Sequence, residues 1–258
     1  MTEKAKRIAK QLIAEHKDKI SFQNLGKNLN LRSKSEAYIA QDYFHKMAGR
    51  GELGGYKIAL SSKVQQEHHK INEPLFGALF KSEIFFSPKV INFNSYQRLG
   101  VEIELAFKLS NKIHNFEKAI NLKNISSFIE SVYPAIELIE DRKADYVGLD
   151  PLSLICDNAW SGGLIVGDPI NDWQRKNFSE IYSSLFWNNE SKKTACVMDA
   201  NPFENLCWLL NDLRDRKKIL LPGMVIISGS VFQIRHAQYG DKITHSLGSG
   251  VEACLMIK

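Results

Sequence analysis

Two stretches decide the fold: GVEIELAFKL at residues 100–109 and YPAIELIE at residues 133–140. Both are rich in apolar residues that alternate or branch at Cβ, which is typical of β-strands. Successive side chains on a strand point to opposite faces. We therefore expect the apolar side chains of the first stretch on one face, and Glu102 and Glu104 together on the other.

Two like charges on one strand face repel each other unless something positive lies between them. A divalent cation would serve, and ligands that are all oxygen suit Mg²⁺, Mn²⁺ or Ca²⁺. On the spacing of Glu102 and Glu104 alone, the commoner explanation is a strand with one face in water. Glu137 lies in an apolar setting, where an unpaired carboxylate is costly. A metal shared by the three glutamates, or an ion pair with Lys or Arg, would stabilise it.

Helices are expected around these strands. An amphipathic pattern predicts a helix over residues 3–17, and a second is expected from about residue 35 to 47 with a serine cap. Glycines at 49, 51, 54 and 55 then break the pattern. We place a boundary there, between a helical N-terminal region (1–50) and a β-rich catalytic domain (51–258).

The C-terminal two thirds are rich in strand patterns without regular alternation of strand and helix. Asn201 and Pro202 are a typical start for one helix, which should carry an apolar stripe of leucines. The stretch MVIISGSVF (224–232) is expected to be a buried strand. This arrangement favours an α+β fold with a curved or closed sheet over a doubly wound one.

Composition narrows the function classes. The chain has 258 residues, 44% of them hydrophobic and 24% charged, with a formal charge of +5. The basic residues are scattered, so we expect no nucleic-acid partner. The N-terminus has no apolar segment typical of a signal peptide, and no stretch is long and apolar enough for a membrane span. The four cysteines form no CxxC pair. We expect reduced thiols and a cytoplasmic location.

Several motifs, taken together and in this order, resemble one enzyme family. The sequence is similar to the 2-oxopent-4-enoate hydratases and 4-oxalocrotonate decarboxylases, within the fumarylacetoacetate-hydrolase-like superfamily. The motifs that carry the resemblance are GYKIALSS, NEPLFGALF, GVEIELAF, PAIELIEDR, CDNAWSGGLIVG, NPFENLCWLLNDL, LLPGMVIISGS and THSLGSGVEA. The resemblance implies a mixed, curved β-roll or barrel core of the fumarylacetoacetate-hydrolase C-terminal type, flanked by helices, and a homo-oligomer.

The resemblance also implies roles for particular residues. Glu102, Glu104 and Glu137 match the family's ligands for Mg²⁺ or Mn²⁺. Lys57 matches the lysine beside the substrate, where it would bind the substrate carboxylate or move a proton. Three further residues are expected at the substrate: Ser161 near its carboxylate, with Asp157 and Asn158 in the same motif.

One position departs from the family pattern. Many of the hydratases carry an aspartate after the proline of the Glu-Pro motif, and Leu75 stands there in this chain. A leucine cannot move a proton or orient water, and the sequence does not show whether Glu73 could substitute. This departure concerns hydration more than the metal site.

The resemblance implies a metal-dependent lyase acting on a small 2-oxo acid, with hydration of 2-hydroxypenta-2,4-dienoate to 4-hydroxy-2-oxopentanoate as the first hypothesis. The alternatives are a 4-oxalocrotonate-type decarboxylase, which Leu75 favours, an acylpyruvate hydrolase, and a diverged non-catalytic homologue. Degradation of aromatic compounds is the implied setting, and a partner enzyme of the same pathway is left open.

Overall fold

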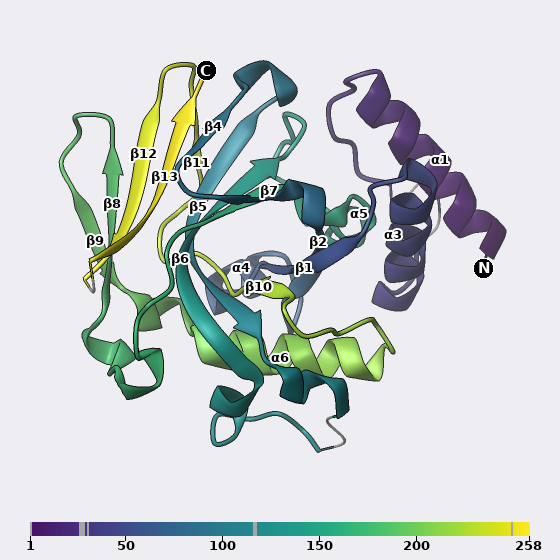
Figure 1. Cartoon of the computed structure of the whole chain (residues 1–258). Helices are drawn as coiled ribbons and strands as arrows, with labels where there is room; N and C mark the ends of the chain where they lie inside the picture. Colours follow the sequence, from purple (N-terminus) through teal and green to yellow (C-terminus); the bar gives the residue numbers. More distant parts are fainter. Residues whose placement is uncertain (1, 26–28, 30, 116–117, 249) are drawn as a thin grey trace.

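The computed structural model describes residues 2–25, 29, 31–115, 118–248 and 250–258. Within these residues the strands form two sheets, one on each side of a shared core (Figure 1). The larger sheet contains β1 (Leu53–Ala59), β2 (Leu75–Phe80), β3 (Ile84–Phe86), β5 (Leu99–Leu109), β6 (Ile129–Glu140), β7 (Ser161–Val166), β10 (Val225–Ile227) and β11 (Arg235–His236). The smaller sheet contains β4 (Lys89–Ile91), β8 (Tyr182–Trp187), β9 (Lys193–Cys196), β12 (Lys242–Leu247) and β13 (Val251–Ile257).

The larger sheet is mixed and strongly curled. Its strand order is β2-β1-β10-β5-β6-β7-β3, and β11 pairs with β5. β1 pairs with β10 and β3 pairs with β7 in parallel, whereas the other pairs in this sheet are antiparallel. Its concave face carries a small apolar cluster with members on five strands: Leu79, Ala106, Ala135, Leu164, Val166 and Ile227. The expected α+β fold with a curved, mixed sheet is therefore confirmed.

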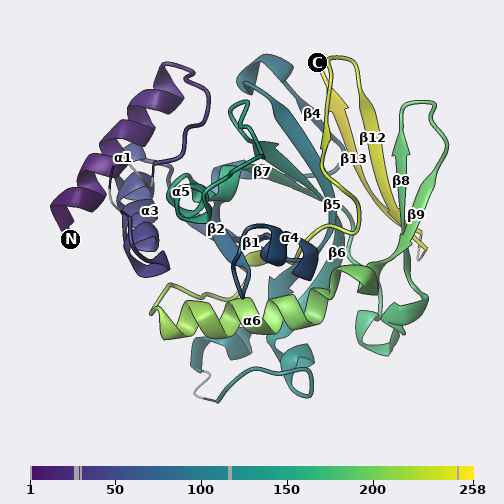
Figure 2. The same cartoon turned by 180° about the vertical axis from the view of Figure 1, so that it is seen from behind.

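The helices cover the sheet at two places. α1 (Thr2–Lys17) and α3 (Lys34–Ala48) pack together on the side away from the smaller sheet, and α5 (Pro151–Cys156) packs against α3 (Figure 2). α6 (Pro202–Asp215) runs beneath the curled sheet. α4 (Lys63–His68) follows β1. None of the helices in the described part of the chain is long and apolar enough to cross a membrane.

Most boundaries follow local rules that the sequence shows. Ser33 caps α3 through the backbone N–H of Glu36, and Gly49 ends this helix in the left-handed region with φ 63°. Ser62 caps α4 in a capping box with Gln65. The expected helices and the expected strands around residues 100–109 and 133–140 are confirmed.

Two local expectations were wrong in detail. Asn201 stands at the N-cap of α6, but its backbone is left-handed (φ 48°) and its side chain makes no capping hydrogen bond. The strand expected over 224–232 ends at Ile227, because Gly229 adopts φ 113° and turns its N–H away from the sheet ladder. That N–H donates to the Glu104 carboxylate instead. The end of the strand therefore provides a hydrogen bond to one of the three glutamates.

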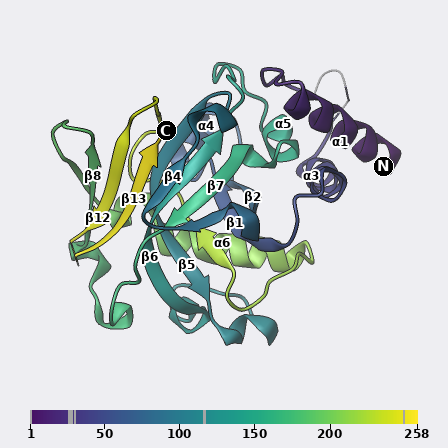
Figure 3. The same cartoon turned by 45° about the horizontal axis from the view of Figure 1, so that its top comes forward.

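The smaller sheet closes the outer face of β5 and β6. Side chains from both sheets form one apolar core between them, with Ile103, Ile136 and Leu138 facing Trp187 and Leu255. The side-on view in Figure 3 shows the smaller sheet and the α1–α3 pair on opposite sides of the curled sheet. β5 and β6 therefore lie at the centre of the molecule, held on both faces, and are a rigid base for side chains that point into the curl.

Candidate metal centre and active-site cavity

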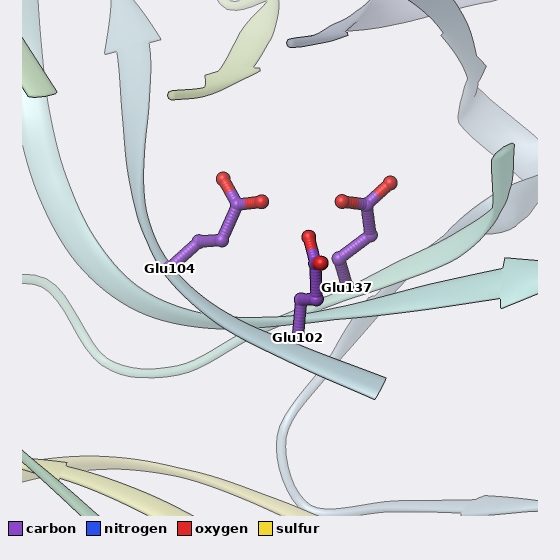
Figure 4. A group of neighbouring side chains, drawn as sticks. All are labelled: Glu102, Glu104 and Glu137. Atoms are coloured by element: carbon purple, nitrogen blue, oxygen red, sulfur yellow. The ribbon is translucent and has the colours of Figure 1, made fainter. Parts of the chain in front are cut away.

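Glu102, Glu104 and Glu137, here called the carboxylate cluster, come from the two central strands. Glu102 and Glu104 lie on β5, and Glu137 lies on β6 directly opposite Glu102 in the antiparallel register. Figure 4 shows their three carboxylates turned toward one another. Each residue offers an oxygen, and these oxygens all lie within 4.8 Å of one another. The strand alternation expected from the sequence thus produces the pairing of Glu102 with Glu104, and the register adds Glu137.

The carboxylates are only partly compensated by the rest of the chain. Glu104 and Glu137 are 2% and 0% exposed. Oε2 of Glu104 accepts the Gly229 N–H at 2.7 Å. Its Oε1, and Oε2 of Glu137, have no N–H or O–H partner within the described residues. A buried acceptor without a partner costs about 1–3 kcal/mol, and more if it is charged, so this arrangement favours a bound cation.

Lys57 is the cation nearest to the cluster. Its Nζ lies 2.8 Å from Oε1 of Glu137 and donates to the Ala159 carbonyl at 3.1 Å. Burial lowers the pKa of Lys57, but the charges of the three glutamates outweigh burial and leave that pKa above its usual value. Lys57 is therefore an ammonium ion in this structure rather than a neutral base.

An ordinary ion pair lowers the pKa of a carboxyl group, but burial and mutual repulsion raise the pKa values of these three. Burial, followed by the charge of Glu137, raises the pKa of Glu102 to about 7 and the pKa of Glu104 well above its usual range. Burial also raises the pKa of Glu137, although Lys57 opposes it. Three acidic side chains therefore share the Lys57 ammonium ion, and the ion pairs of the described residues bring no second lysine or arginine to them.

The donor set fits a hard divalent cation. Three carboxylates with closely spaced oxygens, two of these oxygens without partners, are the ligands that Mg²⁺ and Mn²⁺ prefer, and no thiol or imidazole accompanies them in the described group. The residues present therefore fit the metal that the sequence predicted.

A cavity of about 590 Å³ opens onto the cluster. Lys57 and Glu102 line it, together with Tyr146, Trp160 and Gly229. This volume is within the range of small-molecule sites. A ligand in the cavity can thus reach the carboxylate cluster and the ammonium ion of Lys57 at the same time.

The turn at Asn158–Trp160 positions Lys57. All three residues have positive φ, between 49° and 56°, which non-glycine residues seldom adopt. This turn presents the Ala159 carbonyl to Lys57 and the Trp160 ring to the cavity. Gly77 makes room for it, because a Cβ there would lie 2.4 Å from the Asn158 carbonyl oxygen. Such strain clusters at functional sites.

Asp157 and Asn158 are occupied by bonds within the protein. The Asn158 side chain accepts the Ala78 N–H at 2.7 Å and donates to the Ala78 carbonyl at 3.0 Å. Asp157 accepts two bonds from Arg142 and lies 2.6 Å from Nε2 of His16. Neither is among the described residues that line the main cavity. Contact of their side chains with substrate stays a prediction.

Ser161 lies on the other side of Trp160. Its Oγ is buried without a partner within the described residues, and it lines a second cavity of about 400 Å³ together with Arg50 and Tyr96. Trp160 lines both cavities and separates them. The structure therefore does not bring Ser161 into the cavity that holds Lys57, and its contact with the substrate carboxylate also stays a prediction.

Leu75 and Glu73 are both outside the described lining of the main cavity. Leu75 is fully buried in β2, and Glu73 forms an ion pair with Lys34 at 3.0 Å. Glu73 is thus paired with α3, and nothing in the structure shows it in the role of the aspartate.

Sequence reasoning missed several residues that line the cavity, among them Tyr146, His69 and Asp199. They lie in loops and at a helix end, where no periodic pattern shows which side chains converge. Gly229 was missed as well, although an isolated glycine after a buried strand is a signal for a special backbone conformation. His245 is buried between Ser183 and the Ala135 carbonyl, and it is not among the described residues that line the main cavity.

Comparison with known proteins finds enzymes that are similar to this chain. No protein-family profile matches the chain. The chain is 28% identical over 206 residues to the 2-oxo-hept-4-ene-1,7-dioate hydratase of Escherichia coli, which covers 76% of this chain and 75% of the relative. It is 27% identical over 191 residues to the 2-keto-4-pentenoate hydratase of Paraburkholderia xenovorans (strain LB400), covering 72% and 69%.

Solved structures share the fold. The 4-oxalocrotonate decarboxylase from Pseudomonas putida G7, complexed with magnesium and adipate, superposes with a TM-score of 0.90 at 18% identity, covering 100% of this chain and 98% of that one. The fumarylpyruvate hydrolase from Pseudomonas aeruginosa, in complex with Mn²⁺ and pyruvate, gives a TM-score of 0.57 at 12% identity, covering 78% and 88%. Sequence likeness to hydratases and structural likeness to these enzymes converge with the motifs: the chain is similar in sequence to the 2-keto-4-pentenoate hydratases, and it shares its fold with the 4-oxalocrotonate decarboxylase and the fumarylpyruvate hydrolase.

Proposed function

We propose that this protein is a metal-dependent hydratase of short unsaturated 2-oxo acids, and that it converts 2-hydroxypenta-2,4-dienoate to 4-hydroxy-2-oxopentanoate. The observation that carries the proposal is the carboxylate cluster, with buried oxygens that lack partners among the described residues, beside a cavity that Glu102 and Lys57 line. The hydratases among its relatives supply the reaction class.

Glu102, Glu104 and Glu137 would hold Mg²⁺ or Mn²⁺. When bound, the metal would stabilise negative charge on the 2-oxygen of the substrate as a Lewis acid. Glu104 is oriented for this role by the Gly229 N–H. Such partners fix the direction of ligand oxygens and support metal affinity.

Lys57 would bind the substrate carboxylate. Its raised pKa keeps it charged at neutral pH, and the Ala159 carbonyl holds the ammonium at the cavity wall. Hydration adds a proton and a hydroxyl group across the far double bond of the conjugated acid. One proton must be taken from water and one delivered to the substrate, and Leu75 can do neither. We therefore propose that His69 and Asp199, which line the cavity, activate the water.

Decarboxylation of a 2-oxo-enedioate is the second candidate. The departure at Leu75 favours it, because loss of a carboxylate does not require a group that activates water. The same cluster would serve, since both reactions place negative charge on the 2-oxygen.

Ultraviolet absorbance of freshly made 2-hydroxypenta-2,4-dienoate tests the proposal, because the conjugated dienol absorbs and the hydrated product does not. We expect rapid loss of absorbance with Mg²⁺ that EDTA and Glu104→Gln both abolish. Loss no faster than without protein would reject hydration of this substrate, and the same assay with the 2-oxo-enedioate would then test decarboxylation.

A further inference from the structure

The smaller sheet has a second face, which points away from the apolar core. Alternate side chains of its strands, such as Trp187, Ile243 and Leu255, point into that core. The side chains between them form the outer face, which consists of Tyr182, Ser184, Phe186, Lys242, Thr244, Ser246, Glu252, Cys254, Met256 and Val90. All of these residues are exposed or half-buried. Figure 1 shows this sheet at one side of the molecule, away from α1 and α3.

The outer face carries more apolar surface than a sheet face in water normally does. Tyr182, Phe186 and Val90 are 49%, 40% and 51% exposed, and Met256 is half-buried beside Val90 in the strand register. The side of an antiparallel sheet that faces water is usually polar. Aromatic residues and methionine with few charged neighbours are instead typical of the centre of a protein–protein interface. The composition therefore favours a protein surface as the covering layer.

The two charged residues of the outer face lie on opposite sides of a central row. The central row consists of Phe186, Thr244 and Cys254, which are neighbours on β8, β12 and β13. Lys242 precedes Thr244 on β12, and Glu252 precedes Cys254 on the antiparallel strand β13. Both charged residues are exposed, and the ion pairs found among the described residues include neither of them. Both are therefore available to a partner.

This placement of charge is self-complementary under one kind of symmetry. Two copies stacked face to face are related by a two-fold axis that lies between the faces. An axis parallel to the central row exchanges the two flanking rows and brings Lys242 of one copy beside the partner's Glu252, about one strand spacing of ~4.8 Å to the side. An axis parallel to the strands would keep each row opposite itself and place like charges together, which is unfavourable.

We propose that the outer face binds a second copy of this chain, in a two-fold dimer in which Lys242 of each copy pairs with Glu252 of the other. The central row and the apolar residues beside it form the middle of the interface, and the two symmetric ion pairs fix the orientation. This proposal is independent of the proposed function, because none of the outer-face residues is among the described residues that line the main cavity.

A charge exchange tests the pairing, with sedimentation velocity of the full chain at low ionic strength, over a range of protein concentrations. Lys242→Glu and Glu252→Lys each replace both symmetric ion pairs with like charges. We expect the unmodified chain to dimerise, and each single variant to dimerise at least about tenfold more weakly. The double variant restores opposite charges and should return the dissociation constant to within about threefold of the original.

Recovery in the double variant is the decisive result, because a fold damaged by either substitution would not recover. A monomeric unmodified chain at all concentrations would overturn the proposal. Single variants that associate as tightly as the unmodified chain would overturn it as well, and so would a double variant that remains as weak as the single variants.

A second pair of variants tests the apolar middle of the interface. Phe186→Asp places a charge in the central row, whereas Leu122→Asp places one on an equally exposed apolar residue elsewhere, since Leu122 is 57% exposed in a turn outside the outer face. We expect Phe186→Asp to dimerise at least about tenfold more weakly, because a buried unpaired charge is costly. Leu122→Asp should dimerise as the unmodified chain does. Equal dissociation constants for the two variants would contradict the proposal.

Discussion

Two buried groups of charged side chains lie close to the central strands, and they differ in how completely the chain satisfies them. The arginine cluster consists of Arg142, Asp157, Glu15 and His16. The Arg142 guanidinium is fully buried, and its Nε, Nη1 and Nη2 all donate, to Asp157, Glu15 and the Ile20 carbonyl. In the carboxylate cluster, by contrast, three acids share one lysine and keep buried oxygens without partners.

This difference distinguishes charges that stabilise the fold from acidic groups that are available to bind a ligand. Arg142 ties the end of α1 to the turn before Trp160, and every charge involved has a partner inside the chain. Buried charges are retained when they are paired and hydrogen-bonded. A cluster that lacks such pairing within the described residues is where a cation from solution would be stabilised most.

The largest effect on stability should come from the arginine cluster. Arg142→Met keeps the bulk of the side chain but leaves Asp157 and Glu15 buried without their cation. We expect the free energy of unfolding to fall by about 3–5 kcal/mol, measured by urea denaturation. Lys108→Gln, which breaks the exposed pair with Glu130, is the control and should cost under about 1 kcal/mol. Similar small losses in both variants would remove the contrast between the two clusters.

Replacement of Lys57 tests whether the carboxylate cluster serves catalysis rather than stability. Lys57→Met removes one hydrogen-bonding charge that we assign to the substrate carboxylate. We expect kcat/KM for 2-hydroxypenta-2,4-dienoate to fall about a hundredfold, whereas Mg²⁺ affinity stays equal or increases because a competing cation is lost. Steady-state kinetics and calorimetry measure the two quantities. A parallel loss of metal affinity would instead make Lys57 a structural partner of the metal site.

The pH dependence of metal binding gives a smaller but distinctive effect. Because burial raises the pKa of Glu102 to about 7, this group keeps its proton in the metal-free folded protein and releases it near its ordinary value of about 4.3 in the unfolded chain. The contribution of Glu102 to the stability of the metal-free protein is therefore fully present when the pH is below its unfolded pKa. This contribution is lost as the pH rises to about 7. Mg²⁺ requires the ionised form.

From the protonation of Glu102 we therefore expect Mg²⁺ affinity to fall as pH drops below about 7, by about tenfold per pH unit. The rise in melting temperature on adding Mg²⁺ should grow from pH 5.5 to pH 8. Thermal melts with and without Mg²⁺ at each pH isolate this effect, because the buried histidines contribute to both melts. A shift in melting temperature that does not vary with pH would argue against a buried, protonated ligand.

The sequence predicted those parts of the molecule that depend on local patterns. The periodicity of β5 and the presence of a serine cap on α3 were readable, and strand alternation placed Glu102 beside Glu104. The pairing of Glu102 with Glu137 depends on the register of two distant strands, so the residues alone left an ion pair open as an explanation for Glu137. Lys57 in fact makes such an ion pair, within the same cluster.

The cavity could not be predicted in the same way. Its walls come from segments far apart in sequence, such as α4, the turn at Trp160 and the loop after Gly229. Whether Ser161 or Trp160 faces the cavity depends on three successive left-handed residues, which side-chain patterns do not reveal. The boundary near residue 50, the homo-oligomer and a partner enzyme of the same pathway stay predictions.

The central claim is that the carboxylate cluster binds one divalent metal ion, and titration with Mn²⁺ followed by electron paramagnetic resonance tests it most directly. Glu104→Gln keeps the size of the side chain and removes one ligand charge, and Glu73→Gln serves as a control because Glu73 lies outside the cavity lining. We predict about one Mn²⁺ per chain in the unmodified protein and in Glu73→Gln, and an affinity at least about a hundredfold weaker in a folded Glu104→Gln, since each metal ligand contributes strongly. Equal Mn²⁺ binding in all three proteins, or none in the unmodified protein, would contradict the account.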